Sequence, residues 1–156
     1  MSATPANNID PASVVGHFVN GAERSDDNRP LPVTNPATGQ VIRQVAMASA
    51  GTVAEAVDAA QAAFPAWRDT PPAKRARIMF RFKQLLEEHA DEIAAAITEE
   101  HGKVFDDAMG EFGRGVEVVD YACGIPDLLK GEYSRNVGPG IDSWSDFQPL
   151  GVVAGI

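Results

Sequence analysis

The sequence predicts an α/β fold, with short strands first, then four helices, and finally the start of a doubly wound parallel sheet. Short apolar segments separated by turn residues occupy residues 17–47, and patterns with helical spacing follow from residue 52 onward. An almost uninterrupted apolar run, typical of a parallel strand buried on both faces, occupies residues 150–156. We expect a sheet that is begun here and continues in something larger.

Composition narrows the classes of function. Thirteen Lys and Arg against 22 Asp and Glu give a formal net charge of -9, which disfavours nucleic acid and anionic membrane surfaces as partners. No apolar run approaches the roughly 20 residues of a membrane helix. Cys123 is the single cysteine, which excludes an intrachain disulfide and a multi-thiolate metal site. The N-terminus lacks the basic start of a secretory signal, so we expect a cytoplasmic protein.

The first part of the chain is expected to form a leader and short strands. Residues 1–13 are rich in Ala, Asn, Ser and Pro and have little to bury, which predicts a flexible leader. Strands are expected at His17–Val19, around Val33 and at 41–47, and Asn20-Gly21 is a turn signal. Pro and Gly in Asn35-Pro36-Ala37-Thr38-Gly39 predict a tight turn between paired strands.

Two helices are expected next. Thr52 and Glu55 have capping-box spacing, and Pro65 should bend the chain, so the first helix is expected over 52–64. Its apolar face comprises Val53, Val57, Ala60, Phe64 and Trp67. Thr70-Pro71 is expected to cap the second helix. That helix should bury Ile78, Phe82, Leu85 and Leu86 and turn Lys74, Arg77 and Arg81 outward.

Two more helices and an arm complete the pattern. The third helix should span about 91–101, bury Ile93 and Ile97 and end at Gly102. The fourth should start near Val104 and bury the stripe Phe112, Val116, Val119 and Cys123 before Gly131 ends it. Residues 132–148 resemble an arm or hairpin around Gly138-Pro139-Gly140, with 143–147 as an exposed strand.

Most chemically capable residues have a structural explanation. Cys123 lies in an apolar helical stripe with no His nearby, which favours a buried thiol over a nucleophile. His17, His89 and His101 lack metal-ligand spacing, so no metal site is expected. Glycines 110, 113 and 115 lack the third glycine and the preceding strand of a dinucleotide loop, and close helix packing is the alternative. The basic cluster Lys74, Arg75, Arg77, Arg81 and Lys83 suits a solvated helix face better than a phosphate site.

Arg114 is the candidate binding residue. It lies between Gly113 and Gly115, which leave its guanidinium accessible to a carboxylate that it can hold through two parallel hydrogen bonds. An ion pair within the helix, with Glu111 or Glu117, is the equal alternative.

Several motifs together resemble the N-terminal part of the aldehyde dehydrogenase superfamily. These are the turn at 35–39, Phe64-Pro65-Ala66-Trp67, Arg75-Ala76-Arg77-Ile78, Glu100-His101-Gly102-Lys103 and Pro149-Leu150-Gly151-Val152-Val153. Within it, residues 110–117, Ala122-Cys123 and residues 128–132 resemble the CoA-acylating methylmalonate-semialdehyde dehydrogenases.

The resemblance implies an oxidoreductase of valine or inositol catabolism. Such enzymes convert methylmalonate or malonate semialdehyde, with NAD and CoA, to propionyl- or acetyl-CoA, CO2 and NADH. It implies that Arg114 binds the substrate carboxylate. It also implies that the nucleophilic cysteine, the oxyanion-binding asparagine and the cofactor-contacting residues lie beyond Ile156. By the same resemblance, Cys123 matches a helix position and not the nucleophile.

The resemblance also divides the chain. After the leader at 1–13, it implies the N-terminal part of an NAD-binding domain at 14–131 and the start of an oligomerisation arm at 132–148. The first strand of a Rossmann-like sheet follows at 149–156. The expected whole is a homodimer or homotetramer, of which this chain is a fragment that is inactive by itself. The alternatives are a stand-alone noncatalytic binding or assembly module, and acyl or phosphate binding through the basic helix.

Overall fold

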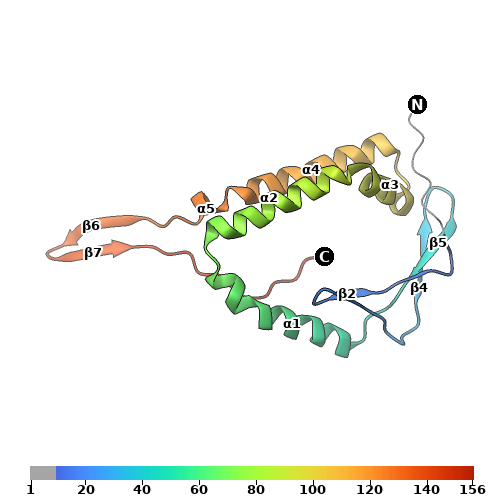
Figure 1. Ribbon diagram of the computed structural model, residues 1–156, viewed down its shortest axis with the longest axis horizontal. Helices are drawn as coiled ribbons and strands as arrows, with labels where there is room; N and C mark the ends of the chain where they lie inside the picture. The colour runs from blue at the N-terminus through green and yellow to red at the C-terminus, as the bar shows by residue number, and fades with distance from the viewer. Residues whose placement is uncertain (1–9) are drawn as a thin grey trace.

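The computed structural model describes residues 10–156, which form seven strands and five helices. The strands are β1 (Val14–Val15), β2 (His17–Val19), β3 (Ala22–Arg24), β4 (Leu31–Asn35), β5 (Gln40–Val45), β6 (Tyr133–Gly138) and β7 (Ile141–Trp144). The helices are α1 (Ala50–Asp69), α2 (Pro72–Glu88), α3 (Ala90–His101), α4 (Phe105–Cys123) and α5 (Ile125–Leu128). Figure 1 shows α2, α3 and α4 gathered on one side, α1 on the other, and the β6–β7 arm projecting from one end.

The strands form three small sheets. β5 lies between β1, which runs parallel to it, and β4, which runs antiparallel, so the order is β1-β5-β4. The predicted turn joins β4 to β5, with Asn35 opposite Gln40 and Gly39 at φ 71°. β2 and β3 form a hairpin whose turn residues Asn20 and Gly21 have φ of 52° and 76°, which confirms that turn signal. Of the expected leader, residues 1–9 lie outside the described part, and Val14–Val15 pairs as β1.

Helix α1 differs from its prediction at both ends. The Ser49 hydroxyl, and not a Thr52–Glu55 capping box, caps the helix by accepting from the Thr52 backbone N–H at 3.1 Å. The helix also continues through Pro65 to Asp69, so the expected end at residue 64 is wrong. Pro65 is exposed, where water can satisfy the carbonyl that loses its helical partner. The α1 stripe is largely uncovered, with no buried residue in the helix.

Helix α2 packs with a different face from the one predicted. Of the predicted stripe, Ile78, Phe82 and Leu85 are exposed and Leu86 is half-buried, whereas Ala76 is buried, and α2 lies against α4. The small Ala76 side chain allows a close approach between helices, which the larger apolar residues would prevent. The expected Thr70-Pro71 cap is also wrong, because the Thr70 hydroxyl donates to the Ala66 carbonyl of α1 at 2.7 Å and Pro71 precedes α2 without a side-chain cap.

The α3–α4 layer confirms the predicted stripes, but the fourth helix ends at Cys123 and not at Gly131, and the separate helix α5 follows it. Ala94 and Ala95 of α3 are buried beside half-buried Ile93 and Ile97, and α3 ends at Gly102 with φ 80°. Along α4, Ala108 and Cys123 are buried. Between them, Phe112, Val116 and Val119 are half-buried, as the predicted stripe requires.

The arm is a hairpin, as expected for residues 132–148. β6 and β7 are antiparallel, and Pro139 and Gly140 form a two-residue loop between Gly138 and Ile141. The second strand covers Ile141–Trp144 and not the expected residues 143–147. It begins earlier because Ile141 pairs with Gly138 directly after the loop, and it ends where Trp144 pairs with Tyr133. Residues 149–156 form no strand with any other segment of residues 10–156. A strand is defined by hydrogen bonds to a neighbouring strand, so the strand expected here stays a prediction.

Candidate functional site

Arg114 lies on the outer face of α4. Two residues turn an α-helix through about 200°. Arg114 follows Phe112 by two positions and precedes Val116 by two, and both of these are half-buried on the packed side. The guanidinium therefore starts from the side opposite the packed stripe, where Arg114 is exposed.

The glycines around Arg114 leave this face bare. A Cβ added at Gly110, Gly113 or Gly115 would meet no atom within 4 Å, so the close-packing explanation for these glycines is wrong within residues 10–156. A helical side chain covers the turn that precedes its own Cα, and Gly110 offers no side chain there. Gly110, four positions before Arg114, consequently places no side chain beside the Arg114 guanidinium.

Arg114 is also free of an ion pair. Glu111, one of its two expected partners, pairs with Lys103, and this hydrogen bond holds the pKa of Glu111 below its ordinary value. Arg114 makes only a minor electrostatic contribution to that shift. Across residues 10–156 no salt bridge or side-chain hydrogen bond joins Arg114 to Glu111 or Glu117. Its forked donors are therefore available to a planar carboxylate.

The other candidate residues offer no assembled chemistry. Cys123 is a free thiol with 7% of its surface exposed, which fits the buried-thiol interpretation. No group of three or more His, Cys, Asp and Glu residues suited to a metal ion occurs in residues 10–156. No helix in that range is long and apolar enough to cross a membrane.

The basic cluster divides in the structure. Lys74, Arg77 and Arg81 are exposed, as expected of a solvated face. The Lys83 ammonium instead lies 2.9 Å from Glu87 of its own helix and 3.4 Å from Asp120 of α4, and these carboxylates raise the pKa of Lys83. Arg75 is half-buried.

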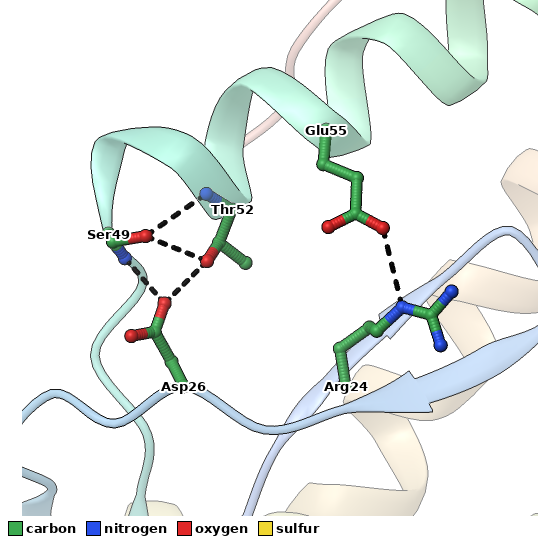
Figure 2. Close-up of polar contacts among 5 residues, drawn as sticks. All are labelled: Arg24, Asp26, Ser49, Thr52 and Glu55. Atoms are coloured by element: carbon green, nitrogen blue, oxygen red, sulfur yellow. Dashed lines mark hydrogen bonds and ion pairs between the residues drawn. The ribbon is translucent and has the colours of Figure 1, made fainter.

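A polar cluster that the sequence analysis missed holds the start of α1 (Figure 2). The Asp26 carboxylate accepts hydrogen bonds from the Thr52 hydroxyl and, at 2.8 Å, from the Ser49 backbone N–H. These bonds, the Thr52 bond foremost, lower the pKa of Asp26 to about 2. Beside them, Arg24 Nε lies 3.4 Å from Glu55. Asp26 and Ser49 are 23 positions apart, so no local pattern could have paired them.

The cluster positions α1 beside an apolar cavity of about 460 Å³. β2 contributes His17, Phe18 and Val19, α1 contributes Val53 and Val57, and the C-terminal segment contributes Val152 and Val153. No Cys, Asp, Glu, Lys or Arg among residues 10–156 lines this cavity. Its polar side chains are His17 and Thr52, and the Thr52 hydroxyl already donates to Asp26, so the cavity mainly offers an apolar packing surface.

Comparisons with known proteins agree with one another. The sequence model of the aldehyde dehydrogenase family matches residues 23–156. The malonate-semialdehyde dehydrogenase of Pseudomonas aeruginosa is 59% identical over 140 residues, which cover 90% of this chain and 28% of that protein. The chain thus spans less than a third of the length of this relative.

Solved structures give the same result. The methylmalonate-semialdehyde dehydrogenase of Oceanimonas doudoroffii superposes with a TM-score of 0.86 at 62% identity, over 88% of this chain and 28% of that one. A methylmalonate-semialdehyde dehydrogenase structure from Sinorhizobium meliloti 1021, complexed with NAD, superposes with a TM-score of 0.86 at 43% identity. The match covers 90% of this chain and 29% of the Sinorhizobium chain. The matched region is the N-terminal portion of these structures.

Proposed function

Because the chain belongs to the aldehyde dehydrogenase family, we propose that it serves an NAD-dependent oxidoreductase that converts malonate or methylmalonate semialdehyde. The proposed reaction takes up CoA and yields acetyl- or propionyl-CoA, CO2 and NADH. Relatives named for these two semialdehydes, at 59% and 62% identity, support the substrate class. The resemblance of residues 110–117 and 128–132 to the acylating branch supports CoA as the acyl acceptor.

Arg114 carries the proposal for the substrate. Both semialdehydes bear a carboxylate, and Arg114 presents an unpaired guanidinium on a face that Gly110 leaves open. Charge-assisted hydrogen bonds to a carboxylate are roughly twice as strong as neutral ones. We assign to Arg114 the binding and orientation of the substrate carboxylate.

The described residues do not fit a dinucleotide. Gly110, Gly113 and Gly115 lie within helix α4, whereas a dinucleotide loop joins a strand to a helix N-terminus. We therefore assign no NAD contact to residues 10–156 and derive no step through the cofactor. Cys123 is buried, so we expect no turnover from the 156-residue chain by itself.

The arm supports a homo-oligomer. Both strands of β6–β7 are exposed, and Tyr133, Val137, Ile141 and Trp144 present apolar surface. A two-stranded hairpin is marginally stable alone and leaves both outer edges unpaired. We propose that the arm pairs with another subunit. This exposed arm is also the observation that favours the second candidate function, a noncatalytic assembly module.

A chimaera tests the proposed function. The matching segment of the Pseudomonas aeruginosa relative would be replaced by residues 10–156, and NADH production with malonate semialdehyde would be measured. We expect activity in the chimaera. We expect Arg114→Gln to raise KM for malonate semialdehyde by about 10- to 100-fold, because a hydrogen bond to a charged group contributes roughly 1.5–3 kcal/mol. Propanal, which lacks a carboxylate, should be oxidised with an unchanged KM.

Matched measurements separate the alternatives. Arg77→Gln removes an exposed charge from α2 and should leave both KM values unchanged. If Arg114→Gln raises KM equally for malonate semialdehyde and for propanal, carboxylate binding by Arg114 is contradicted. A folded chimaera that forms the oligomer of the relative but produces no NADH would favour the assembly module.

A further inference from the structure

Arg75 differs from the exposed members of the basic cluster. Its Nε is enclosed and has no hydrogen-bond partner among residues 10–156. A guanidinium stays charged at all physiological pH values, so it cannot lose a proton to relieve the enclosure. Buried charged donors in proteins almost always have an acceptor. The Nε–H of Arg75 therefore indicates an acceptor that this part of the chain does not supply.

A second arginine reaches the same place. Arg68 and Arg75 both line a cavity of about 350 Å³, together with Leu129, Phe147, Gln148 and Pro149. In Figure 1 the end of α1, the start of α2, the short helix α5 and the segment returning from the arm come together at the base of the arm. The cavity belongs to this junction.

The charge of the cavity contrasts with that of the chain. The protein carries a formal net charge of -9, yet no Asp or Glu is among the lining residues. Arg68 donates two hydrogen bonds to Asp69, at 2.7 Å from Nε and 3.3 Å from Nη2, and Asp69 does not line the cavity. Arg75 has no salt-bridge partner among residues 10–156. Within the described part of the chain, two arginine side chains therefore line one hollow that contains no acidic residue, and Arg75 is the one without an anionic partner.

We propose that this cavity binds a small organic oxyanion. Arg75 and Arg68 would donate charge-assisted hydrogen bonds to its carboxylate or phosphate oxygens. Leu129 and Phe147 would contact its apolar part. The site is distinct from Arg114, because no residue of α4 lines it. Arg75 would then bind a ligand, whereas the sequence pattern places it on a solvated helix face.

Isothermal titration of the purified chain tests this site. The probes are butanoate, inorganic phosphate and the neutral analogue butanamide, each at the same ionic strength set with sodium chloride. We expect at least one anion to bind, butanamide not to bind, and the Arg75 Nε–H signal in a ¹H–¹⁵N spectrum to shift during the titration. Tighter binding of butanoate identifies a carboxylate ligand, and tighter binding of phosphate identifies a phosphorylated one.

Variants locate the binding. We expect Arg75→Gln to weaken binding at least tenfold, and Arg77→Gln, two residues along the same helix, to leave it unchanged. Arg114→Gln should also leave it unchanged, which separates this cavity from the proposed substrate site. Circular dichroism checks the fold of each variant. If Arg75→Gln does not fold, Arg68→Gln decides, with an expected weakening of severalfold.

The proposal is overturned by either of two results. One is that neither anion binds more tightly than chloride. The other is that a folded Arg75→Gln variant, or a folded Arg68→Gln variant in its place, binds the anion as the unchanged chain does.

Discussion

Helices α1 and α4 are nearly equal in length, 20 and 19 residues, but the chain uses them differently. α4 packs against α2 and α3 and buries Ala108 and Cys123. α1 buries no residue, and Val53 and Val57 on its stripe are 54% and 49% exposed. An apolar stripe thus shows which side chains share a face, whereas its burial depends on partners that the stripe itself does not specify.

The two helices are also held differently. α4 depends on apolar packing along its length, whereas α1 is fastened at its first turn by polar contacts from Asp26 and Arg24 (Figure 2). Apolar packing has little dependence on pH. A carboxylate that accepts hydrogen bonds stabilises the fold only while it is ionised.

The largest effect is expected from overfilling the packed helix. Ala108 has 0% of its surface exposed, so Ala108→Leu forces a larger side chain into a closed site. We expect a loss of about 3 kcal/mol in the free energy of unfolding, measured by urea denaturation. The matched change Ala54→Leu, at an exposed position of α1, should stay within about 0.5 kcal/mol. Similar losses in both variants would contradict the contrast between the helices.

The next effect concerns the junction between the helical layer and the sheet. Gly102 has φ 80°, and an added Cβ would lie 2.9 Å from Pro36 Cγ and 3.0 Å from the Ala37 backbone nitrogen. We expect Gly102→Ala to cost about 1.5 kcal/mol, from the left-handed conformation and the contact with the β4–β5 turn.

Gly110→Ala is the control for Gly102→Ala. Its Cβ would enter open space within α4, so a gain of about 0.5 kcal/mol is expected in the same urea measurement. If Gly102→Ala unfolds at the same urea concentration as the unchanged chain, the close approach of α3 to that turn is contradicted.

The smallest effect is expected at the start of α1. Ser49→Ala removes the hydroxyl that accepts from the Thr52 N–H and should destabilise the helix by about 1 kcal/mol. Hydrogen exchange of the amides in α1 measures this loss. The amides of α4 serve as the internal reference and should keep their protection.

The Asp26 carboxylate adds a pH dependence to the same helix. Its pKa is lowered from 3.8 to about 2, so its contribution to stability is complete above about pH 4 and is lost as the pH falls toward 2. Faster exchange of α1 amides at pH 2.5 than at pH 5, after correction for intrinsic rates, is expected in the unchanged chain. Asp26→Asn should reduce the difference between the α1 exchange rates at pH 2.5 and pH 5. If the difference is as large in this variant as in the unchanged chain, it arises from other carboxylates.

Local features of the fold could be predicted from the sequence. Asn20-Gly21, the 35–39 turn and Gly102 impose backbone angles through their own residue types, and each prediction is confirmed. The face on which α2 packs could not be predicted, because Ile78 and Ala76 both lie on possible contact faces and the choice depends on α4. The cap of α1 depends on Asp26, which is distant in sequence.

The candidate site shows the same limits. Accessibility of Arg114 could be predicted, since flanking glycines lack side chains whatever their surroundings. The sequence left open whether Glu111 would pair with it, and Lys103, eight positions before Glu111, decides against this pair. The enclosure of Arg75 has no sequence signal, because it arises where α2, α5 and the segment after the arm meet.

The two-residue loop of the arm has a consequence for the order of folding. β6 and β7 join residues that are close in sequence, and hairpins of this kind close in about 1–10 μs. β1 must instead find β5 about thirty positions later, where Val14 meets Gln44, at a higher cost in chain entropy. The arm is therefore expected to form while the N-terminal strands are still searching for their register.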